Sequence, residues 1–168
     1  MSSEALAGLH QAMNTLDQLE TSITKQAARL AFELTNASEL VKDQQQKQIL
    51  DALGESIRDA YDLFWDAYDY ADTLTKFLDY SVEHPEEREA LEKQGLKLDK
   101  QAIEDAIIDF SVQIDKATSK INLYIDTYKN MLGGEIVKDI NNYVATLYKF
   151  RGALLIFGGE VNKVLFGL

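Results

Sequence analysis

Carboxylates are the side chains with which this sequence could do chemistry. Asp and Glu number 28 against 17 Lys or Arg in 168 residues, so the net charge is −11 at pH 7. The sequence has no cysteine, which excludes thiol nucleophiles, cysteine-ligated zinc and iron–sulfur clusters. The two histidines, His10 and His84, lie in no E-x-x-H or H-E-x-x-H arrangement, the spacings used by di-iron bundles and zinc proteases. We therefore expect no enzyme activity, no bound metal and no cofactor.

Some acidic pairs have the spacing of known metal-binding motifs. Two D-x-x-x-D pairs, Asp62/Asp66 and Asp105/Asp109, resemble the magnesium–diphosphate motifs of all-α prenyl-transferring enzymes. On a helix, however, both pairs point away from the apolar face, and the chain is short for that fold. All-α nucleotide pyrophosphohydrolases are closer in size, and two pairs resemble their first E-x-x-E motif: Glu83/Glu86 and Glu89/Glu92. Because the later E-x-x-D motif of those enzymes is missing, neither resemblance predicts a catalytic site.

The stretch from 59 to 80, DAYDLFWDAYDYADTLTKFLDY, is both acidic and aromatic. It holds six Asp and seven aromatic residues against one Lys. When Phe64 is placed at the centre of a buried helix face, with about 100° per residue, five carboxylates fall on the opposite face. They are Glu55, Asp59, Asp62, Asp66 and Asp69. The same rotation predicts that Tyr70, Phe77 and Tyr80 share this outer face with the acids.

An ordinary solvated helix face is the simplest explanation of these acids. Three features favour a binding surface instead. Few basic residues stand at four-residue spacing from the acids to relieve their repulsion. Residues 51–115 hold 18 Asp or Glu against 6 Lys or Arg, and exposed aromatics are typical of interfaces. We therefore predict a non-enzymatic module that inhibits or adapts a basic protein partner, for example a nucleic-acid-binding one. The predicted contact residues are Asp59, Asp62, Asp66, Asp69, Tyr70, Asp72, Phe77 and Tyr80.

Direct nucleic-acid binding is disfavoured by the negative charge and by the lack of a basic stripe.

The C-terminal segment, YKFRGALLIFGGEVNKVLFGL, is the second distinctive region. Gly152, Gly158 and Gly159 lie inside a helical pattern, where glycine costs about 1 kcal/mol relative to alanine. Close packing against a neighbouring helix is one explanation. The alternatives are a membrane-active, toxin-like segment and an interface in a homo-oligomeric assembly. Both alternatives use the same apolar residues: Leu155, Ile156, Phe157, Val164, Leu165 and Phe166.

Apolar residues at alternating spacings of three and four predict four long helices that carry these side chains. The clearest pattern places Ile103, Ile107, Phe110, Ile114 and Ile121 on one face. Helices of about 30 residues are each roughly 45 Å long. The sequence therefore predicts an all-α fold with a single domain over residues 1–168. Its architecture is an elongated antiparallel four-helix bundle with a short extra helix in the second connection.

Breaks in these patterns predict where the helices end. Gly133 and Gly134 mark the last turn, and Pro85 ends the second helix while opening the short one. Asp99 is the predicted N-cap of the next long helix, with Leu98 as part of a hydrophobic staple.

The first turn leaves two alternatives. It lies either within residues 36–38, with Ser38 as the cap, or at Gly54, which would lengthen the first helix.

The sequence begins without a basic region followed by an apolar stretch, and no segment reaches about 20 apolar residues. We expect a cytoplasmic protein from this pattern.

Overall fold

Four long helices account for most of the described chain. The computed structural model describes residues 3–87 and 99–167. The long helices are α1 (Ser3–Leu40), α2 (Gln44–Glu83), α4 (Lys100–Tyr128) and α5 (Gly134–Phe166), and the short 3-10 helix η1 covers Pro85–Glu87. The predicted all-α bundle is confirmed. Of the predicted short helix after Pro85, only η1 falls within the described residues.

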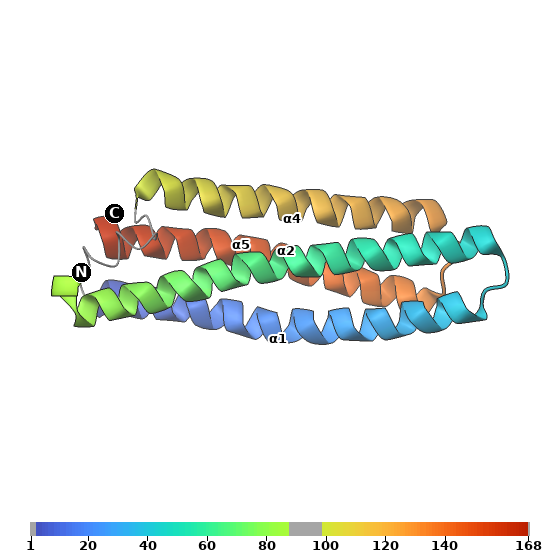
Figure 1. The fold of residues 1–168 in the computed structure, drawn as a ribbon, viewed down its shortest axis with the longest axis horizontal. Coiled ribbons are helices and arrows are strands. Elements are labelled where there is room, and N and C mark those ends of the chain that lie inside the picture. Colours follow the sequence, from blue (N-terminus) through green and yellow to red (C-terminus); the bar gives the residue numbers. More distant parts are fainter. Residues whose placement is uncertain (1–2, 88–98, 168) are drawn as a thin grey trace.

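The helices form a bundle in which each helix is antiparallel to its two neighbours. Helix α1 packs against α2 and α5, and α4 packs against the same two helices, so that α2 and α5 face each other across a diagonal. The start of α1, the end of α2, the start of α4 and the end of α5 all lie at one end of the bundle (Figure 1). The acidic end of α2 therefore lies beside the acidic start of α4.

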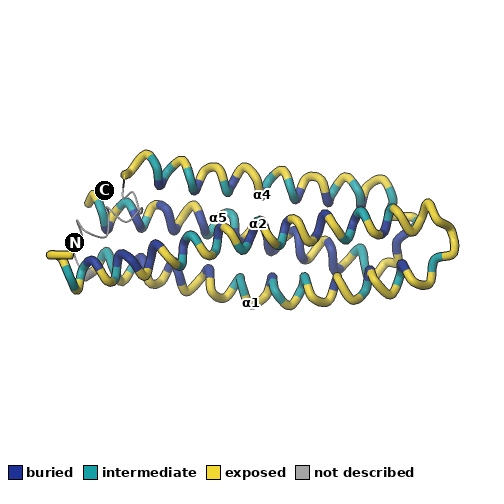
Figure 2. The backbone as a smooth tube through the Cα atoms, viewed as in Figure 1, coloured by how far each residue is buried: buried dark blue, intermediate teal, exposed yellow. Residues whose placement is uncertain are grey.

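Large aromatic side chains fill the centre of the bundle. Phe64 of α2 and Phe150 of α5 are fully buried and meet edge to face, with ring centroids 4.7 Å apart. Tyr143 of α5 is also fully buried, and its hydroxyl donates a hydrogen bond of 3.0 Å to the carbonyl of Ile57 in α2. Burial raises the pKa of Tyr143 far above its ordinary value. Buried positions recur along each helix on its inner side, and exposed positions lie outside (Figure 2).

The first turn lies at neither of the two predicted places. Helix α1 continues to Leu40 and α2 begins at Gln44, with Asp43 as the N-cap. The Asp43 side chain accepts hydrogen bonds from the backbone amides of the next helix, 2.8 Å from Gln45 and 3.4 Å from Gln46. Ser38 is a buried residue inside α1, and Gly54 lies inside α2. The turn therefore forms where a carboxylate can satisfy free amides.

The remaining helix ends agree with the breaks in the sequence. The Asp99 side chain accepts a hydrogen bond of 3.1 Å from the Gln101 amide, which confirms the predicted cap of α4. Leu98, the staple partner, lies outside the described residues. Helix α5 begins at Gly134, directly after Gly133, so the glycine pair does mark the last turn.

Replacing the cap of α2 tests the corrected turn. We expect Asp43→Ala to lower the free energy of unfolding by about 1 kcal/mol, because two amides lose their acceptor. Chemical denaturation followed by circular dichroism measures the change. Gln44→Ala, which alters the next residue and removes no capping oxygen, is the matched control. Equal stability of the Asp43→Ala variant and the wild type would contradict this account of the turn.

Candidate functional site

An acidic stripe runs along the outer face of α2. We use this name for Glu55, Asp59, Asp62, Asp66 and Asp69, all of which are exposed, as their helical phase predicted. Among the described residues, none of the five forms an ion pair or a side-chain hydrogen bond. At helical spacing these carboxylates repel one another, and no ion pair within the described residues offsets the repulsion. The stripe therefore presents uncompensated negative charge to the solvent.

Two aromatic residues predicted to accompany the acids are placed differently. Phe77 is buried, with 8% of its surface exposed, so its prediction as a contact residue is wrong. Tyr70 is half-buried, its ring lies 5.7 Å from that of Phe110 in α4, and burial raises its pKa. Helix α4 covers this flank of α2.

The other two predicted contact residues are exposed in part but have partners within the chain. Asp72 lies 2.8 Å from the ammonium group of Lys76, one helical turn away. Tyr80 is 39% exposed, its ring stacks on His84, and its hydroxyl donates a hydrogen bond to Glu87. That hydrogen bond raises the pKa of Tyr80. Asp72 and Tyr80 are thus less free to bind a partner than the acidic stripe.

The acidic end of the bundle extends the same negative surface. Glu83, Glu86 and Glu87 are exposed at the end of α2, and Asp105 and Asp109 are exposed near the start of α4. Glu89 and Glu92, the second E-x-x-E pair of the sequence, lie outside the described residues.

Polar side chains join α1 to α2 along the whole seam between them. The ring of His10 lies 2.6 Å from Asp79, and the hydroxyl of Tyr68 donates a 2.5 Å hydrogen bond to Asp17. Farther along the seam the pairs are Thr24 with Tyr61, at 3.2 Å, and Ser38 with Asp51, at 2.9 Å. None of these pairs was predicted from the sequence.

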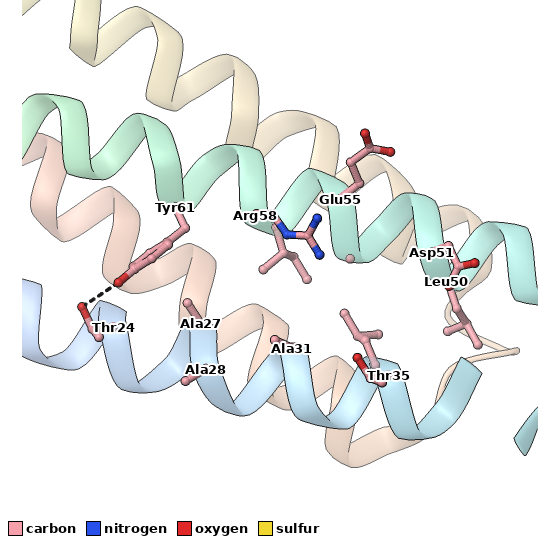
Figure 3. Close-up of a pocket in the computed structure, with 13 residues that line it drawn as sticks. Thr24, Ala27, Ala28, Ala31, Thr35, Leu50, Asp51, Glu55, Arg58 and Tyr61 are labelled. Atoms are coloured by element: carbon pink, nitrogen blue, oxygen red, sulfur yellow. Dashed lines mark hydrogen bonds between the residues drawn. The ribbon is translucent and has the colours of Figure 1, made fainter. Parts of the chain in front are cut away.

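A groove of about 550 Å³ opens between the last two of these pairs (Figure 3). Its walls are Thr24, Ala27, Ala28, Ala31, Leu34 and Thr35 of α1 with Leu50, Asp51, Gly54, Glu55, Ile57, Arg58 and Tyr61 of α2. This groove was not predicted from the sequence. The feature of the sequence that indicates the groove is the set of small residues Ala27, Ala28 and Ala31 in α1. They line the groove together with Gly54 of α2 and leave the space between the helices unfilled.

The predicted membrane or oligomer contacts in α5 divide into two groups. Phe157 and Val164 are buried in the core, so they are not surface contacts in this fold. Leu155, Ile156 and Phe166 are exposed, and Leu165 is half-buried.

The three glycines within this segment differ in how closely other helices approach them. A Cβ at Gly158 would lie 2.9 Å from Ile107 in α4, which supports close packing there. No atom lies within 4 Å of a Cβ built at Gly152 or Gly159. Close packing within the chain therefore explains one of these three glycines.

A charged cluster joins α1 to α5 on another side of the bundle. The Arg29 Nε atom lies 2.8 Å from Glu33 Oε1 and 3.3 Å from Asp139 Oδ2, and its Nη2 atom lies 3.5 Å from Glu135. Asp139 is buried, and one oxygen of Glu33 and one of Asp139 are buried without a hydrogen bond. Burial and the adjacent Asp139 carboxyl raise the pKa of Glu33.

Neither a metal centre nor a membrane-spanning helix is found within residues 3–87 and 99–167. This part of the chain contains no group of three or more histidines and acids placed to hold a metal ion. It also contains no helix whose length and apolar character would let it cross a membrane. No protein-family model, curated protein or solved structure matches the chain.

The cluster around Arg29 predicts a pH dependence of stability. Because folding raises the pKa of Glu33 above 4.5, the folded protein binds more proton there than the unfolded chain does. The contribution of Glu33 to stability therefore falls as pH rises from 4.5 through the raised value. We expect Glu33→Gln to raise the melting temperature by a few degrees at neutral pH, with the gain shrinking toward about pH 4.

Thermal unfolding over this pH range measures the effect. Glu39→Gln, a change at an exposed acid in the same helix, is the control and should show no such trend. A variant at Glu33 that is less stable than the wild type at neutral pH would overturn the prediction.

Proposed function

We propose that the chain is a non-enzymatic protein-binding module whose acidic stripe on α2 binds a basic protein partner. The observation that carries the proposal is that the five exposed carboxylates of the stripe have no ion-pair partner among the described residues. Such a row of unneutralised charge costs stability in the free protein. A basic partner would remove this cost and would also be steered toward the surface by long-range attraction.

The shape of the bundle supports this assignment. The stripe lies on a long helix held by buried contacts on its other face, so its carboxylates keep a nearly fixed spacing before binding. A preformed surface loses less conformational entropy on association than a flexible one. The acids at the shared end of α2 and α4 enlarge the negative surface, and the partner we propose is correspondingly basic over an extended area. Inhibition of that partner, by covering its basic surface, is the function we favour.

Charge reversal tests the proposal. In the triple variant Asp62→Lys, Asp66→Lys and Asp69→Lys, we expect unchanged helicity and the loss of basic proteins captured by the wild type from a lysate. Capture by the wild type should weaken as salt rises, because surface attraction is screened. The control reverses three exposed acids elsewhere, with Glu4→Lys, Glu39→Lys and Asp126→Lys, and has the same net charge. Equal capture by the two triple variants would refute a specific role of the stripe.

Self-association is a second candidate function, favoured by an apolar patch on α4 and α5. Ile108 and Leu155 line a shallow groove between these helices and are 55% and 43% exposed. Val112 is exposed one turn from Ile108, and the open Gly159 leaves room for another chain. Contiguous exposed apolar surface of this kind is typical of interfaces between protein chains.

Light scattering tests this second candidate. We expect the wild type to form a dimer or larger oligomer and Leu155→Glu to be a monomer. Leu123→Glu changes an exposed leucine outside the shallow groove and serves as the control. A monomeric wild type at high protein concentration would eliminate self-association.

A further inference from the structure

The groove between α1 and α2 has the composition of a small-molecule site. Its volume of about 550 Å³ lies within the roughly 300–1,000 Å³ typical of ligand pockets. Apolar side chains and small residues make up most of its walls, among them Ala27, Ala31, Leu34, Leu50 and Ile57. A few polar groups stand at its ends and mouth, an arrangement that orients an apolar ligand.

Small residues keep the groove open. Gly54 lies in the interior of α2, where glycine costs about 1 kcal/mol relative to alanine. A Cβ at this position would meet only Leu34 Cδ1, at 3.9 Å, so no close approach of α1 demands a glycine there. On the facing side of the groove, Ala28 and Ala31 are exposed rather than covered by α2. The groove therefore exists because neither helix supplies a large side chain to fill it.

A single cation stands at the mouth of this groove. Arg58 is exposed and forms no ion pair with any other described residue. This is unexpected from its sequence, because Glu55 and Asp62 stand at the helical spacings that usually favour ion pairs. In Figure 3 the guanidinium of Arg58 lies on the groove side of α2, whereas the carboxylate of Glu55 points away from α1.

The two ends of the groove differ. At one end, the hydroxyl groups of Thr24 and Tyr61 form a hydrogen bond of 3.2 Å close to the turn that carries Arg58 (Figure 3). At the other end, Asp51 already accepts a hydrogen bond from Ser38. The Thr24 hydroxyl also donates a hydrogen bond of 3.3 Å to Glu20, so the donors without a partner near this end are those of the Arg58 guanidinium. Apolar surface extends from there toward Leu50.

We propose that this groove binds a free, medium-chain carboxylic acid, with its carboxylate at Arg58 and its acyl chain over Gly54 toward Leu50. The helix from Leu50 to Arg58 is roughly 12 Å long, enough for such a chain in an extended form. A guanidinium matches a carboxylate through paired charge-assisted hydrogen bonds. The site is distinct from the acidic stripe in its ligand and does not depend on the proposed protein partner.

The sole tryptophan gives a local readout of binding. Trp65 packs edge-on against Tyr61, with ring centroids 6.2 Å apart, and Tyr61 forms part of the groove wall. Sodium decanoate, below its micelle-forming concentration, is the probe, and calorimetry and Trp65 fluorescence are the two measurements. Decanol and decyltrimethylammonium test the charge preference with a chain of the same length. We expect saturable binding of decanoate at one site, weaker binding of decanol, and none of the cationic probe.

Two variants locate the site. Arg58→Gln should weaken decanoate binding by about ten- to a hundredfold, the loss expected for hydrogen bonds to a charged group, and should leave decanol binding unchanged. Ala31→Leu places a larger side chain in the groove and should abolish the binding of both probes. The matched controls are Lys47→Gln, an exposed cation of α2 outside the groove, and Ala145→Leu, an exposed alanine of α5. Both should bind decanoate as the wild type does.

Several results would overturn the proposal. They are a wild type that binds no decanoate saturably, equal affinity for decanoate and decanol, preference for the cationic probe, or an unchanged affinity of Arg58→Gln. The variant with Asp62, Asp66 and Asp69 reversed to Lys should still bind decanoate. The acyl site and the protein-binding stripe can therefore fail independently.

Discussion

The edge-to-face contact between Phe64 and Phe150 holds the two diagonal helices, α2 and α5, at the separation on which the rest of the bundle depends. Both rings are fully buried, and such a pair contributes about 0.5–1.5 kcal/mol beyond the burial of its surface. The hydrogen bond from Tyr143 to the Ile57 carbonyl joins the same two helices in the core. With this diagonal fixed, α1 and α4 occupy the two remaining sides, each packed against both α2 and α5.

This arrangement places the aromatic residues and the carboxylates of α2 in different environments. Its aromatic residues are drawn toward the neighbouring helices, where Tyr61, Trp65 and Tyr68 surround Phe64 and Phe77 lies buried. Its carboxylates stay in solvent, because burial of an unpaired charge is far more costly than burial of an aromatic ring. The acidic surface therefore has less aromatic character than the sequence suggested, and charge is its main means of recognition.

The contacts between α1 and the rest of the bundle are more polar. Hydrogen bonds and ion pairs at His10, Asp17, Thr24 and Ser38 tie it to α2, and Arg29 ties it to α5. Where α1 carries alanine rather than a larger apolar residue, these polar contacts hold the two helices around an unfilled groove. The same helix thus provides a wall of the proposed acyl site and the partly buried Glu33 carboxyl, whose raised pKa makes stability depend on pH.

The sequence by itself determined the number and type of the long helices, the Asp99 cap, the glycine turn before α5 and the outward direction of Asp59, Asp62, Asp66 and Asp69. These features depend on local periodicity and on hydrogen bonds between residues close in the chain. The Asp43 cap also depends on hydrogen bonds between residues close in the chain. An aspartate before three glutamines, where the apolar periodicity shifts, indicates this cap in the sequence, although the cap was not predicted. Only the tertiary structure decided that Phe77 and Tyr70 are covered, that Arg58 has no ion pair among the described residues, and that a groove separates α1 from α2. Each of these depends on how closely two helices distant in sequence approach, which periodicity within one helix does not specify.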